Sequence, residues 1–205
     1  MSDWPDANAF RFPQLSYLDD QALLAQFAKG DRDAARNLTL HFTPRLMRYA
    51  IRMLSDRLEA EDVVQETMLR LWHQAPLWQV GGAKIETWLY QVASHLCIDR
   101  FRKRKRGFSV SLNDIDEPGD EQPTAEAGLM EKDRQIALYK AIDLLPERQR
   151  QAIVLRHIED LGNGEIAVIM GIGIEAVESL IARAKRNLGA ILAGRQDELM
   201  KDEGH

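Results

Sequence analysis

Apolar residues recur at helical spacing along most of this chain, and this pattern constrains the fold more than any other feature. The pattern begins with Leu23, Leu24 and Phe27, and a second run extends from Leu38 to Met53. Pro44 lies inside the second run, so a break or kink near residues 39–44 is left open. Helices are also expected over about 58–72, 84–105, 133–145, 146–157, 164–170 and 174–192. Strand-like alternation is missing, so the sequence predicts an all-α fold.

An acidic segment divides these helical stretches into two groups. Residues 107–131 contain three glycines, two prolines and few large apolar side chains, a composition typical of a flexible linker. The sequence therefore predicts two small helical domains between short tails. The expected parts are an N-terminal tail, a first domain, a linker, a second domain and a C-terminal tail, over residues 1–18, 19–106, 107–132, 133–193 and 194–205.

The charge of the chain is unevenly distributed. The net charge of −5 would argue weakly against a nucleic-acid partner, but residues 100–112 carry six basic side chains and no acidic one. Residues 113–133 then carry eight acidic side chains and one basic one. A concentrated basic patch favours a polyanion, because binding phosphates releases counterions. The alternative is a solvated helix end.

Cysteine and histidine usage argues against a disulfide framework or a metal site. Cys97 is the one cysteine, and the five histidines are scattered, so neither has zinc-ligand spacing.

The opening residues carry Asp3 and Asp6 and no apolar run of signal-peptide length, and nowhere do about 18 apolar residues follow one another. We expect a cytoplasmic protein with no cofactor, no metal and no membrane contact of its own.

Residues 163–183 have the spacing of a helix-turn-helix. Ala167 is small where two helices would cross, Gly171 falls at the turn, and Val177 points back into the core. An ordinary αα-hairpin is the alternative. In a helix-turn-helix the second helix lies in the major groove of DNA. Its exposed residues here would be Glu175, Ala176, Glu178, Ser179, Ala182 and Arg183, with Lys185 and Arg186 reaching phosphate or guanine.

The helix around residues 60–72 is amphipathic, with a polar face that includes an exposed leucine. Ala60, Val64, Thr67, Met68 and Leu71 share one face, and Asp62, Gln65, Glu66 and Leu69 share the other. A metal-dependent nuclease ranks low, because no histidine, lysine or third carboxylate completes a site. A protein-docking face is the better interpretation, with a merely solvated face as the alternative.

The next predicted helix combines aromatic side chains with the basic run. Thr87, Trp88 and Tyr90 precede the bases of residues 100–106 by a few turns. Aromatic side chains beside a basic stripe suit single-stranded nucleic acid, because unpaired bases stack while the cations hold the backbone. Core packing is the alternative for Trp72, Trp78, Trp88 and Tyr90.

These motifs together resemble those of a bacterial extracytoplasmic-function (ECF) sigma factor, a two-domain initiation factor of RNA polymerase. The resemblance covers about Leu23–Arg106 and Asp133–Leu192. It rests on four ordered markers: Ala60-Glu-Asp-Val-Val-Gln-Glu; Trp88-Leu-Tyr with Cys97-Ile-Asp and the basic run; Leu145-Pro-Glu-Arg-Gln-Arg; and Glu165-Ile-Ala with Gly171.

The resemblance implies a non-enzymatic protein whose partners are core RNA polymerase (β′ clamp helices and β flap), promoter DNA and an anti-sigma factor. Contact with the clamp helices would fall to Asp62, Gln65, Glu66 and Leu69. Reading and melting of the −10 element would fall to Trp78, Lys84, Thr87, Trp88 and His95, with a base captured in a loop pocket near Gly81–Lys84 and the backbone held by Arg100, Arg102, Lys103 and Arg104. The −35 element would be read by Glu175, Ala176, Glu178, Ser179, Arg183, Lys185 and Arg186.

Three places depart from the family pattern. Ser94-His95 replaces the end of an Ala-Arg-Asn run, Ala176-Val-Glu-Ser-Leu180 replaces a Thr-Val-Lys-Ser-Arg run, and Gly162 replaces a capping serine. We therefore expect an unusual or less stringent −35 preference. The weak recognition helix also keeps a second hypothesis open, a sigma-like decoy that sequesters a regulator without initiating transcription.

Overall fold

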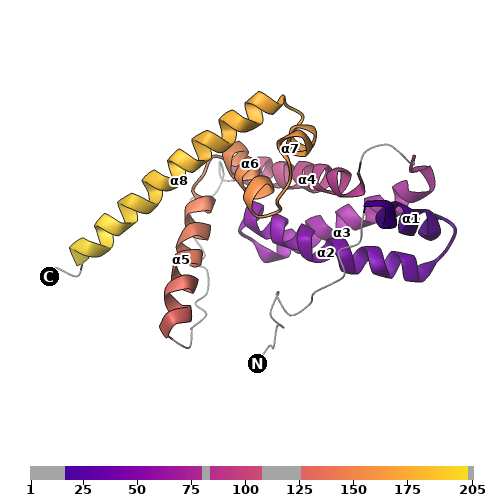
Figure 1. Cartoon of the computed structure of the whole chain (residues 1–205), viewed down its shortest axis with the longest axis horizontal. Coiled ribbons are helices and arrows are strands. Elements are labelled where there is room, and N and C mark those ends of the chain that lie inside the picture. Colours follow the sequence, from indigo (N-terminus) through magenta and orange to yellow (C-terminus); the bar gives the residue numbers. More distant parts are fainter. Residues whose placement is uncertain (1–16, 80–83, 108–125, 203–205) are drawn as a thin grey trace.

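The computed structural model describes the backbone of residues 17–79, 84–107 and 126–202, and the side chains of residues 20–79, 84–104 and 134–194. Within these ranges the regular structure is entirely helical, which confirms the all-α prediction (Figure 1). The elements are α1 (Tyr17–Ala28), α2 (Arg32–Leu54), α3 (Arg57–Gln74), the short 3-10 helix η1 (Ala75–Leu77), α4 (Ile85–Gly107), α5 (Glu126–Asp143), α6 (Glu147–His157), α7 (Asn163–Met170) and α8 (Ile174–Asp202).

Side-chain caps define the ends of the long helix α2. The Oδ1 of Asp31 accepts hydrogen bonds from the backbone N–H groups of Asp33 and Ala34 at 2.9 and 3.2 Å, which starts the helix. Ser55 ends it in a left-handed conformation. The helix passes through Pro44 without ending, so the possible break near residues 39–44 does not occur.

The first unit is a bundle in which α2 packs against α1, α3 and α4. Its buried side chains come from the apolar stripes seen in the sequence, among them Leu38, Leu46, Leu71 and Leu89. The second unit packs α8 against α5, α6 and α7. The two helices α3 and α4 lie in contact within the first unit, and this positions the groove described below.

Two helices of the second unit are longer than the sequence predicts. Helix α5 begins at Glu126, inside the segment predicted to be linker, because the Ala-Glu-Leu-Met composition around residues 125–130 favours a helix despite Gly128. Helix α8 continues to Asp202, through most of the predicted tail, because its last turns contain no proline to stop it.

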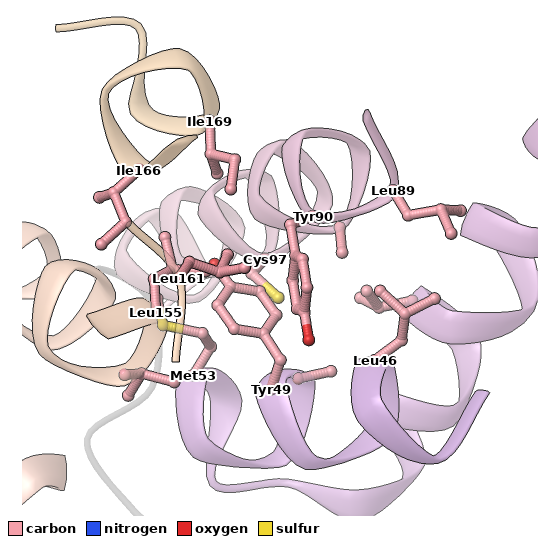
Figure 2. Close-up of a cluster of buried hydrophobic side chains, with 14 of the residues drawn as sticks. Leu46, Tyr49, Met53, Leu89, Tyr90, Cys97, Leu155, Leu161, Ile166 and Ile169 are labelled. Carbon is pink, nitrogen blue, oxygen red and sulfur yellow. The ribbon is translucent and has the colours of Figure 1, made fainter. Parts of the chain in front are cut away.

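The two units also pack against each other. Helix α7 contacts α4, helix α6 contacts α2, and α6 and α7 lie between the first unit and α8 (Figure 1). Their buried side chains form one continuous cluster. Tyr49 of the first unit lies beside Leu155 and Leu161 of the second, and Tyr90 and Ile166 belong to the same cluster (Figure 2). The domain prediction did not include this contact.

Candidate functional site

Helix α3 presents its polar face to solvent while its opposite face is buried. Asp62, Gln65 and Leu69 are exposed and Glu66 is half-buried. The residues between them on the helix face the core, namely Val63, Val64, Thr67 and Met68. Because the buried side anchors the helix, the exposed side is held as a fixed surface on which another protein can dock.

This surface is one wall of a groove between α3 and α4. The groove has a volume of about 1010 Å³ and mixes acidic, basic and apolar side chains. It is lined by Glu59, Asp62, Gln65, Glu66, Leu69, Arg70, Leu96, Asp99, Arg100, Lys103 and Arg104. The structure therefore brings the four residues predicted to contact polymerase together with part of the basic run.

The described members of the basic run divide into two groups. Arg100 and Arg104 turn toward α3: the NH2 group of Arg100 lies 3.4 Å from Asp62, and that of Arg104 lies 3.0 Å from Asp56. Arg104 also donates to the backbone carbonyl of Leu54 at 3.1 Å, near the C-terminal end of α2.

Arg102 and Lys103 form the second group, and both are exposed; Lys103 lines the groove, whereas Arg102 does not. A guanidinium of Arg102 lies 3.7 Å from Asp99. Contact of all four bases with the DNA backbone stays a prediction, but Arg100 and Arg104 also hold α3 and α4 together.

The aromatic residues near the start of α4 are mainly part of the packing. The rings of Trp78 and Trp88 meet edge to face, with centroids 5.8 Å apart, and both side chains are half-buried. Trp72 packs on Phe27 with centroids 4.6 Å apart, and Tyr90 is buried. The indole N–H of Trp78 is buried without a hydrogen-bond partner among the described residues.

Lys84 is exposed at the start of α4, whereas Thr87 is buried. The predicted base pocket falls largely on residues 80–83, which lie outside the described residues. His95 is exposed, and its neighbour Ser94 is buried with its hydroxyl 2.7 Å from that of Tyr49. Ser94 is therefore a core residue and not a surface reader.

Cys97 lies in the core of the first unit. Burial raises the pKa of its thiol to about 12, opposed in part by the charge of Arg100. The thiol is therefore protonated near neutral pH, which agrees with packing in the core and not with a metal or redox role.

The helix-turn-helix forms as its spacing predicts. Gly171 adopts the left-handed conformation (φ 62°, ψ 40°) between α7 and α8, and Val177 is fully buried behind it. A carboxylate oxygen of Glu165 accepts from the backbone N–H of Gly162 at 3.0 Å. Because glycine has no side chain, the other half of a capping box is missing. Ile174, the first residue of α8, is 51% exposed.

The outward surface of α8 carries the residues predicted to read the −35 element. Ser179 is half-buried, and the others are exposed: Glu175, Ala176, Glu178, Arg183, Lys185 and Arg186. The amide of Asn163 donates to Glu178 at 3.4 Å, so this glutamate also links the two helices of the motif. The bases are confined to the later turns of the helix.

Glu159 is a buried carboxylate that the sequence did not single out. It follows α6, and its two oxygens accept from Nε and NH2 of Arg48 at 2.9 and 2.7 Å. The hydroxyl of Tyr90 donates to it at 2.6 Å. Burial alone would lower the pKa of Arg48, but the hydrogen bond and charge of Glu159 outweigh this and raise it. Burial and the same carboxylate raise the pKa of Tyr90 well above its usual value.

Among the described residues, no helix is both long and apolar enough to cross a membrane. No cluster of three or more His, Cys, Asp or Glu side chains among these residues has the arrangement of a metal site.

The first unit carries the groove between α3 and α4, and the second unit packed on it carries a helix-turn-helix, a motif found in many DNA-binding proteins. Residues 38–107 match the family described as Sigma-70 region 2, and residues 135–188 match Sigma-70, region 4. The chain is 30% identical over 176 residues to the ECF RNA polymerase sigma factor SigW of Bacillus subtilis, an alignment covering 80% of this chain and 92% of that one. It is 31% identical over 175 residues to SigE of Mycolicibacterium smegmatis, covering 83% and 67% of the two chains.

Solved structures show the same fold. CnrH, in complex with the cytosolic domain of CnrY, matches with a TM-score of 0.63 at 24% identity, covering 85% of this chain and 97% of that one. RpoE from Bartonella quintana, in complex with the anti-sigma factor NepR, matches with a TM-score of 0.60 at 23% identity, covering 77% and 96%. The chain belongs to the ECF RNA polymerase sigma factors, which are transcription initiation factors. The resemblance seen in the sequence motifs is thereby confirmed.

Proposed function

We propose that this chain binds core RNA polymerase through the groove between α3 and α4 and directs it to promoters with −35 and −10 elements. The observation that carries this proposal is the exposed wall of α3, where Asp62, Gln65 and Leu69 stand in one groove above a fully buried helix face. An exposed leucine ringed by charged side chains is typical of a docking surface, with an apolar centre and a polar rim. The β′ clamp helices are the expected partner.

The outer side of α4 would hold the −10 element. Lys84, His95 and Arg102 are exposed along it and offer cations and polar groups to the backbone and bases, and Lys103, which lines the groove, adds a further exposed cation. Trp88 lies beside them half-buried, so a base could stack only on its accessible edge. The buried Thr87 would act by supporting this surface.

Helix α8 would read the −35 element. Its exposed Arg183, Lys185 and Arg186 are suited to phosphate and guanine, whereas Glu175 and Glu178 in the first turns repel the backbone. Such a helix binds DNA weakly by itself. Tethering to polymerase raises its effective concentration at the promoter and compensates for the weak contacts.

Control by an anti-sigma factor is part of the proposal. It is supported by the similar fold of the Bartonella quintana sigma factor, whose solved structure is a complex with the anti-sigma factor NepR. The cytoplasm, which holds polymerase and DNA, is the expected location.

The proposal is tested by mixing the protein with sigma-free core polymerase and fragmented genomic DNA and mapping transcript ends. We expect discrete starts that share an upstream element. Polymerase binding without discrete starts would contradict promoter reading by this chain, and absence of binding would favour the decoy hypothesis, to which the acidic start of α8 lends its support.

A further inference from the structure

The carboxylate of Glu159, in the connection after α6, joins the second unit to helices α2 and α4 of the first. Its side chain is fully buried, while Arg48 on α2 and Tyr90 on α4 supply the three hydrogen bonds described above. Charge-assisted bonds of this length are the strong ones in proteins, and a carboxylate that lost them inside the interface would be left buried and unpaired. The contact therefore requires the two units to hold one particular register.

Other polar contacts cross the same boundary. Lys84 at the start of α4 lies 2.8 Å from Glu165 on α7. At the other end of the interface, a guanidinium N–H of Arg150 donates to the backbone carbonyl of Met53 at 2.8 Å. Between these contacts the apolar cluster of Figure 2 fills the interface. These contacts define what we call the closed state.

The closed state does not fit promoter DNA. The −35 and −10 elements are centred about 25 base pairs apart, or about 85 Å at 3.4 Å per base pair. In the closed state the start of α4 touches the first helix of the helix-turn-helix through the 2.8 Å contact of Lys84 and Glu165. Two readers in contact with each other do not reach both elements of one straight duplex.

Closure leaves the polymerase surface open while it covers part of the −10 surface. Asp62, Gln65 and Leu69 are exposed in the closed state. Thr87 and Lys84, by contrast, line a small pocket closed on its other side by Gly164, Glu165 and Val168 of α7. Polymerase can therefore dock on a closed molecule, whereas engagement of both promoter elements requires the units to part.

We propose that Glu159 is the latch of an autoinhibited closed state, and that breaking its contacts with Arg48 and Tyr90 is the step that frees the two promoter readers. The functional consequence of opening rests on the proposed function, whereas the contact between the two units is a property of the protein alone. A ligand that binds the open state better shifts the population toward it by that difference in affinity. The contacts of Glu159 therefore set how much binding free energy polymerase and promoter must supply to open the protein.

Opening can be measured as a distance between two spin labels on the full-length chain. Arg36 on α2 and Ala190 on α8 are both exposed, so cysteines at these positions would report the separation of the units by double electron–electron resonance. The native Cys97 is buried and remains unlabelled in the folded protein. The unmodified interface should give one narrow distance that lengthens when core polymerase and promoter DNA are added.

The test variants are Glu159→Gln and Arg48→Met, neither of which touches the proposed polymerase or DNA surfaces. Each should raise the ratio of open to closed molecules by about tenfold or more, since removal of one member of a buried charged pair is strongly destabilising. Combined, they should do little more than either alone, because both break the same contact. The matched control is Asp160→Asn, which removes a negative charge at the neighbouring, fully exposed position without changing the distance.

The outcomes separate the latch from the proposed function. The latch is overturned if Glu159→Gln keeps the narrow closed-state distance, or if the control opens as much as the variant. Helicity measured by circular dichroism should be unchanged in each variant, and a loss of helicity would contradict a role confined to the interface. If Glu159→Gln opens but no variant gives discrete transcript starts, the latch stands and the proposed function fails. If starts appear, Glu159→Gln should need less factor for the same yield, and an equal requirement would overturn the autoinhibitory role.

Discussion

Leu69 offers the sharpest test of the docking groove, because its contribution can be calculated from its exposure. The side chain is 46% exposed in the middle of the groove wall. Complete burial of a leucine side chain contributes about 1.5–3 kcal/mol. Covering the exposed 46% against polymerase should therefore contribute about 0.7–1.4 kcal/mol, so Leu69→Ala should weaken core binding by about 3- to 10-fold.

The matched control is Leu40→Ala. Leu40 is 45% exposed, also lies on a long helix of the first unit, and does not line the groove. Both variants lose the same atoms at the same exposure, so their effects on folding should be similar. Binding to core polymerase would be measured by fluorescence anisotropy, with thermal unfolding of each variant alongside. Equal affinities for the two variants would refute docking at this groove.

Three further predictions follow from the contacts of the same unit. Reversal of both Asp62 and Glu66 to lysine should abolish core binding in a pull-down while circular dichroism stays unchanged, because exposed ion pairs contribute at most about 1 kcal/mol each; unfolding of this variant would show that the face is structural. Arg104→Ala should lower the free energy of unfolding by about 1–3 kcal/mol, since the carbonyl of Leu54 loses its charged donor. Lys103→Ala should leave the melting temperature unchanged and reduce the salt dependence of promoter opening. Equal melting temperatures for the two variants would contradict this division of the basic run. A thiol reagent at pH 8 should modify Cys97 only in denaturant, because burial raises its pKa to about 12, and rapid labelling of the native protein would contradict the packing.

Local features of the fold were predictable because neighbouring residues produce them. The turn at Gly171 followed from its distance to Ala167 and Val177, and the two faces of α3 followed from its periodicity. The start of α5 is not predicted by the sequence pattern, because acidic residues and Gly128 are interspersed with the strong helix formers around residues 125–130.

The packing of the two units could not be predicted in the same way. Glu159 lies 111 residues from Arg48 and 69 from Tyr90, and no periodicity connects positions so far apart. From the sequence, a glutamate in a short connection between helices is expected to be exposed to solvent, because charged side chains are seldom fully buried. The division of the basic run into two groups could not be predicted for the same reason, because the partners of Arg100 and Arg104 are distant in the sequence.

Site-specific crosslinking tests most directly whether the groove between α3 and α4 is the polymerase-binding site. A photoreactive amino acid would replace Gln65, which is exposed in the groove, and in a second protein Leu40, which lies outside it. After irradiation with core polymerase, crosslinked peptides would be identified by mass spectrometry. The account predicts that position 65 crosslinks to the β′ clamp helices and position 40 does not. Crosslinks from both positions, or from neither while the protein still binds polymerase, would contradict it.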